Sequence, residues 1–146
     1  MQIIRSFEHG DATAIGFGVR VLVLSSEGEQ GQISRRLARL GGRVDQVEEL
    51  FAALSELIDD PAGYGLFVVD CDSAGVGGLE AAQKAVQMLG QVVQRVPVLL
   101  VSGEPRDHSF PLDRSSPTIL RAPISAVSLK VGFEHALRER LFNRAA

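Results

Sequence analysis

The stretch Leu66-Phe67-Val68-Val69-Asp70 decides the fold, because four consecutive apolar residues lead into a carboxylate. A short, unbroken apolar run is typical of a strand covered on both faces, and the Gly-rich loop at residues 74–78 ends it. Apolar residues then recur at helical spacing from Leu79 to Val93. This part of the chain therefore predicts a strand, a loop and a helix in that order.

The same alternation extends in both directions along the chain. Further strands are predicted at 19–24, 43–47, 97–101 and 118–120, and helices at 30–40, at 50–59 and after the capping residue Ser125. Between Glu104 and Pro117, two internal prolines leave any helix short and poorly specified. Five strands alternating with helices predict an α/β fold, a five-stranded parallel sheet between two helical layers in a three-layer sandwich.

Sheets of this kind bind ligands outside the carboxyl ends of their strands. The candidate functional residues are therefore those that follow the predicted strands: Ser25, Ser26, Glu27, Asp70, Cys71, Asp72, Ser102 and residues 121–123. Asp72 is expected to be a turn residue, and Cys71, beside two acids, an unreactive apolar filler.

The 146 residues, 45% hydrophobic and 23% charged, suit one compact domain. We expect this single domain at residues 19–146, preceded by an N-terminal extension at residues 1–18. Three roles fit the extension, which is too apolar for a free tail: an added strand, a cover for an exposed helix face, or the contact of a homodimer.

Charge and composition exclude several classes of protein. A net charge of −3 with few aromatic residues argues against nucleic-acid binding. No apolar stretch approaches the roughly 20 residues that span a bilayer, so no membrane partner is expected. A single cysteine and no visible secretory signal predict a cytoplasmic protein. The three histidines have no metal-ligand spacing, and no Lys-Ser or Lys-Thr pair accompanies the glycines at 75–78 to make a phosphate-binding loop.

Over about residues 19–142 the pattern resembles the receiver domain of bacterial two-component response regulators, a flavodoxin-like (βα)5 fold. Asp70 ends the third strand, where that family has its phosphoacceptor, and Gly78 opens the next helix. Ser102 with Gly103 ends the fourth strand, and Pro123 follows the fifth. The resemblance implies that Asp70 is a phosphoacceptor-like residue, supported by Ser102 and Pro123.

The departures from the family concern the residues that bind Mg²⁺ or supply positive charge at its phosphorylation site. Ser25 and Ser26 stand where the family places the pair of acids that hold Mg²⁺, so these are degenerate metal-site positions and Mg²⁺ binding is expected to be weak. Ala122 replaces the lysine before the proline, and Ile119 replaces the switch aromatic of the fifth strand. Phosphoryl transfer depends on electrostatic stabilisation by such cations. The sequence therefore predicts an atypical receiver with no cofactor, in which Asp phosphorylation is impaired or absent.

The predicted function is that of a stand-alone receiver-like module in phosphorelay signal transduction, since the chain has no room for an output domain. It is expected not to be an enzyme and to act by binding a protein partner such as a histidine kinase or an output protein. A basic cluster, Arg35, Arg36, Arg39 and Arg43, favours an acidic partner surface.

Two alternatives stay open at this point. The first is an active receiver whose Asp70 is phosphorylated by a histidine kinase, with a metal site rebuilt from Glu27, Asp70 and Asp72. The second is a small α/β ligand-binding protein or enzyme that uses the same crevice.

Overall fold

The computed structural model describes residues 18–28, 31–90, 95–113 and 115–138. Its centre is one parallel sheet with the strand order β2-β1-β3-β4-β5. The strands are β1 (Arg20–Leu24), β2 (Arg43–Val47), β3 (Leu66–Asp70), β4 (Val98–Ser102) and β5 (Thr118–Arg121). The helices are α2 (Gln32–Arg39), α3 (Leu50–Asp59), α4 (Leu79–Leu89) and α6 (Ala126–Ala136). This architecture confirms the predicted α/β fold, whereas the roles considered for the N-terminal extension fall on residues 1–17, outside the described part.

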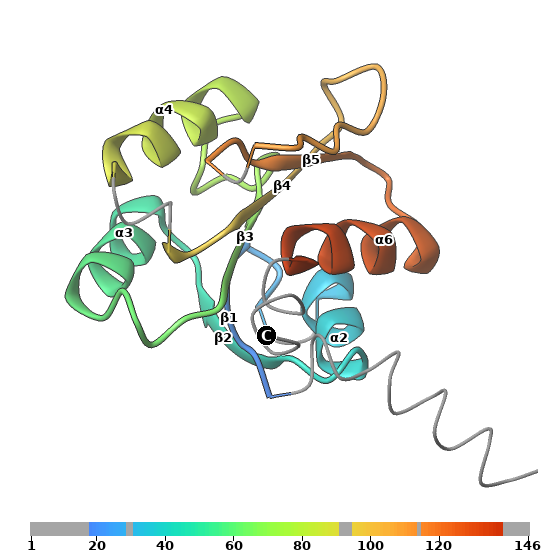
Figure 1. The fold of residues 1–146 in the computed structure, drawn as a ribbon. Coiled ribbons are helices and arrows are strands. Elements are labelled where there is room, and N and C mark those ends of the chain that lie inside the picture. The colour runs from blue at the N-terminus through green and yellow to red at the C-terminus, as the bar shows by residue number, and fades with distance from the viewer. Residues whose placement is uncertain (1–17, 29–30, 91–94, 114, 139–146) are drawn as a thin grey trace, which may run out of the picture.

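Helices α2 and α6 lie on one face of the sheet, and α3 and α4 lie on the other (Figure 1). Side chains alternate between two cores because the strand period is two. In β3, Leu66 and Val68 pack toward α2 and α6, while Phe67 and Val69 pack toward α3 and α4. These four residues are buried, which explains the unbroken apolar run that identified the strand.

The helix ends are fixed by groups that the sequence supplies locally. The Glu49 carboxylate accepts hydrogen bonds from the backbone N–H groups of Phe51 (2.8 Å) and Ala52 (3.3 Å), which starts α3. Ser125 caps α6 in a capping box with Ser128, as predicted for the start of the last helix. None of the helices in the described ranges is long and apolar enough to cross a membrane.

The connection between β4 and β5 contains no helix among its described residues, in agreement with its prolines. The chain instead folds back beside the outer edge of β5, where Ser109 and Ile119 form an antiparallel bridge with N···O distances of 2.7 and 3.0 Å. The Arg138 guanidinium donates to the carbonyls of Pro111 (3.1 Å) and Leu112 (2.8 Å), which ties this loop to the end of α6. The loop therefore covers an edge strand that would otherwise be unpaired.

Candidate functional site at the carboxyl ends of the strands

The sheet register brings the predicted site residues to one edge. Leu24 pairs with Val69, so Ser25 follows β1 beside the end of β3. Asp70 pairs with Val101, which places Ser102 one residue further along β4. The carboxyl ends of these parallel strands therefore form the crevice that the sequence predicted.

Asp70 is half-buried at the end of β3, and hydroxyl groups surround its carboxylate. Its Oδ2 accepts hydrogen bonds from Ser25 Oγ (3.4 Å) and Ser73 Oγ (3.0 Å). Both hydroxyls are themselves held by the backbone, since Ser25 Oγ accepts from Glu27 N–H (3.2 Å) and Ser73 Oγ accepts from Ser26 N–H (3.1 Å). The acid at the predicted phosphoacceptor position is thus oriented by uncharged donors.

Asp72 forms a second cluster that the sequence did not predict. Its Oδ1 accepts from Ser102 Oγ (3.3 Å) and its Oδ2 accepts from the backbone N–H of Gly103 (2.8 Å). Ser102 Oγ also accepts from Glu104 N–H (3.1 Å), and Glu104 Oε2 accepts from Leu79 N–H (2.8 Å) at the start of α4. Asp72 was expected to be a turn residue, with a rebuilt metal site as the alternative, yet it links the loop after β3 to the end of β4.

The end of β5 closes the crevice through backbone contacts. Ala122 N–H donates to Ser102 O (2.8 Å), and the Ala122–Pro123 peptide bond is cis. Arg121 points to the β4–β5 loop, where its guanidinium donates to Arg106 O (2.6 Å) and its backbone N–H donates to His108 Nδ1 (2.8 Å). The cation nearest in sequence to Ala122 is therefore engaged outside the Asp70 cluster.

No protein-family model matches this chain, and no curated protein sequence matches it. Solved structures do resemble it. A response regulator receiver domain protein from Clostridium thermocellum superposes with a TM-score of 0.66 at 14% identity, covering 85% of this chain and 98% of that one. The fold is that of a receiver domain. A chemotaxis response regulator of Vibrio cholerae gives a TM-score of 0.60 at 20% identity, covering 82% of this chain and 99% of that one.

A third solved structure with the receiver fold contains a magnesium ion. The receiver domain of a sensor histidine kinase from Pseudomonas aeruginosa, with a magnesium ion coordinated in its active site cleft, gives a TM-score of 0.62 at 16% identity, with 83% and 98% of the two chains covered. Mg²⁺ sheds water reluctantly and is held mainly by carboxylates. In the present receiver fold, the groups that contact Asp70 are the hydroxyls of Ser25 and Ser73, which do not fit that ion.

A metal site rebuilt from other acids does not form either. Within residues 18–28, 31–90, 95–113 and 115–138, no group of three or more His, Cys, Asp or Glu side chains could hold a metal ion. Glu27, Asp70 and Asp72 are all among these residues, so the structure does not assemble the rebuilt site considered from the sequence. Asp72 directs its two oxygens at the end of β4 instead.

Cys71 behaves as a filler of the core. It is fully buried, and its Sγ lies 3.8 Å from Val69 O. Burial, with smaller contributions from the nearby carboxylates of Asp72 and Asp70, raises the pKa of its thiol to about 12. The thiolate, which is the reactive form of cysteine, is therefore strongly disfavoured.

A separate hollow lies away from the crevice of this receiver fold. A cavity of about 390 Å³ opens between α4 and the segment before β5, lined by Gln83, Val86, Gln87, Gly90, Ser115, Ser116 and Pro117. It includes none of the residues that the sequence singled out as candidates.

Proposed function

We propose that this chain is a receiver-like signalling module that acts by binding a protein partner, with impaired or absent Mg²⁺-dependent phosphorylation of Asp70. The observation that carries the proposal is the hydroxyl surroundings of Asp70, formed by Ser25 and Ser73. Charge that develops on a transferred phosphoryl group is stabilised by metal ions and cationic side chains, and serine hydroxyls supply neither. Ala122, in place of a lysine, removes a further cation.

The partner that suits the surface is acidic. Arg35 and Arg39 are exposed on α2, and they line a shallow groove together with Gln32 and Arg36. The Arg36 guanidinium is held by Ile124 O (2.9 Å). Clustered arginines steer acidic surfaces toward themselves and bind carboxylates through paired hydrogen bonds. We therefore assign α2 as the contact for an acidic surface of a histidine kinase or an output protein.

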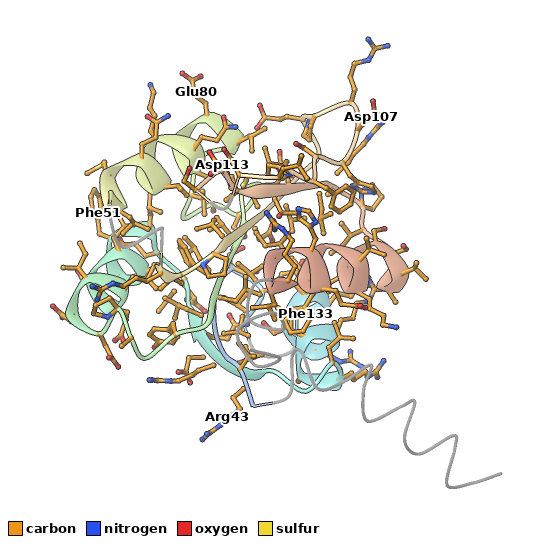
Figure 2. The ribbon with its side chains drawn as sticks, viewed as in Figure 1. Arg43, Phe51, Glu80, Asp107, Asp113 and Phe133 are labelled. Carbon is orange, nitrogen blue, oxygen red and sulfur yellow. The ribbon has the colours of Figure 1, made fainter. Side chains whose placement is uncertain are left out.

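Arg43 widens this basic surface, although it is not part of the helix. It is the first residue of β2, and Figure 2 shows its side chain pointing away from the body of the domain. The predicted cluster thus spans two elements, joined by the turn at residues 40–42.

The experiment that tests the proposal is incubation with acetyl phosphate and Mg²⁺, followed by measurement of the intact mass. We expect no species heavier by one phosphoryl group. A heavier species that disappears in Asp70→Ala, and persists in the exposed-loop control Asp107→Ala, would support the active phosphoacceptor instead. Figure 2 places Asp107 on the loop that projects beyond β5.

A small-molecule function has one feature in its favour, the cavity beside α4, which is not the crevice considered for this function from the sequence. Its amide and hydroxyl lining suits a polar, uncharged ligand. Native mass spectrometry of the purified protein tests this alternative, since a stably bound small molecule would support it.

A further inference from the structure

Two hydrogen-bond donors at the end of β4 converge on one carboxylate. The Ser102 hydroxyl and the Gly103 backbone N–H are adjacent in the chain, and they donate to the two different oxygens of Asp72. A hydroxyl and a backbone N–H directed at the same point form an arrangement that binds oxyanions. The oxyanion bound in this structure is the side chain of the protein itself.

The donors are held in place by contacts that do not involve Asp72. Ser102 is completely buried, its carbonyl accepts from Ala122 N–H (2.8 Å), and its Oγ accepts from Glu104 N–H (3.1 Å). A Cβ at Gly103 would lie 3.4 Å from Asp72 Oδ2, which is an ordinary van der Waals contact, so the carboxylate reaches this N–H without strain. The site is therefore built into the end of β4, and it would persist if the Asp72 side chain were shortened.

A second internal carboxylate, that of Glu104, accepts a hydrogen bond from a neighbouring donor at the start of α4. The first turn of α4 offers unpaired N–H groups and the positive end of the helix dipole. Glu104 Oε2 accepts from Leu79 N–H there (2.8 Å). An anion that approaches Ser102, Gly103 or Leu79 from solvent thus meets donors that already have an internal acceptor, and it is repelled by two carboxylates.

We propose that Asp72 is an internal occupant of an anion-binding site formed by Ser102 and Gly103, and that it excludes phosphate-class oxyanions from this site. The inference rests on the proposed function, since a phosphoryl group on Asp70 would have to displace Asp72 to reach Ser102. It adds a second obstacle to phosphoryl signalling that is separate from the missing metal ligands. It also implies that removing the Asp72 carboxylate by a single substitution would free the Ser102 and Gly103 donors for an external anion.

The test is a titration of ¹⁵N-labelled protein with inorganic phosphate at constant ionic strength, followed at the Gly103 amide resonance. In the wild-type protein this resonance should not shift. In Asp72→Ala it should shift in a saturable manner, and adding Ser102→Ala to that variant should weaken phosphate binding by about tenfold. Asp107→Ala removes the same charge from the loop that follows and should behave as wild type.

Two results would overturn the inference: no saturable shift at Gly103 in Asp72→Ala, or phosphate binding to the wild type as tight as to the variant. Amide hydrogen exchange gives a further check on the wild type alone, because Gly103 N–H should be protected by Asp72. Rapid exchange at Gly103 would reject the occupied site even if the variant failed to fold. A wild type that resists acetyl phosphate, with no phosphate binding in Asp72→Ala, rejects this inference and leaves the proposed function standing.

Discussion

Ser25 Oγ lies 3.4 Å from Asp70 Oδ2, so the neighbour of this carboxylate is a hydroxyl group and not a second acid. The hydroxyl supplies a weak, uncharged hydrogen bond, whereas an acid at the same place would supply charge for a divalent cation. Asp70 stands where the resembled family has its phosphoacceptor, and we propose that the hydroxyls around it leave too little charge to hold a divalent cation.

Mg²⁺ should bind the wild-type protein with a dissociation constant weaker than about 1 mM, because Asp70 offers one carboxylate among hydroxyls. Ser25→Asp combined with Ser26→Asp should tighten binding by about tenfold or more. Isothermal titration calorimetry measures both constants, and Ser55→Asp on the exposed side of α3 is the control for an acid added away from the crevice. Tight wild-type binding that Asp70→Asn abolished would contradict the proposed loss of the metal site.

Asp70→Asn should change the free energy of unfolding by less than about 1 kcal/mol. In a cluster of acids, neutralising one member relieves repulsion and stabilises the fold, but here the partners are Ser25 and Ser73, which can also donate to an amide oxygen. Urea unfolding followed by circular dichroism gives the difference. A larger stabilisation would reveal an anionic cluster around Asp70.

Alkaline stability should depend on Cys71. The pKa of its thiol rises from 9.0 to about 12 on folding. The protonated thiol therefore contributes fully to the free energy of unfolding below pH 9, and this contribution is lost as the pH rises toward 12. Between about pH 8 and about pH 10.5 the free energy of unfolding should therefore fall less in Cys71→Ala than in the wild type. The two decreases should differ by roughly 1 kcal/mol or more. Urea unfolding at the two pH values measures this, and equal losses in both proteins would show that the thiol does not titrate as a buried group.

Beryllofluoride, a mimic of the phosphoryl group, should leave amide exchange over residues 104–123 unchanged. This segment is tied to its surroundings by the Ser109–Ile119 bridge and by Arg138, and Ile119 replaces the aromatic residue that the resembled family uses as a switch. A segment without two alternative packings cannot transmit a ligand signal. Hydrogen exchange with mass spectrometry tests this, and new protection of the segment would restore the conventional switch.

The sequence predicted β2, β3 and α3 with the bounds that the structure has, because apolar runs and local stop signals mark these elements. It also predicted that the residues after the strands would share one edge of the sheet, but it did not single out Ser73, whose hydroxyl donates to Asp70. It did not predict the bond from Asp72 to Ser102, which joins residues 30 positions apart. The periodicity of apolar residues predicts which face of a strand or helix a residue occupies, but it does not predict which hydrogen-bond donor a loop side chain contacts. The Ser109–Ile119 bridge was also missed, because its two hydrogen bonds join backbone groups and the loop that contains Ser109 has no strand periodicity.

The central claim is that the crevice lacks the groups that make Asp70 a phosphoacceptor, and restoring them tests it most directly. The variant Ser25→Asp/Ser26→Asp/Ala122→Lys/Asp72→Ala regains two acids and a cation and removes the internal anion. The decisive measurement is the rate of acetyl phosphate incorporation with Mg²⁺, followed by intact mass in this variant and in the wild type. The variant should gain one phosphoryl group at least about a hundredfold faster than the wild type. A wild type that is phosphorylated on Asp70 as fast as the variant would contradict the claim.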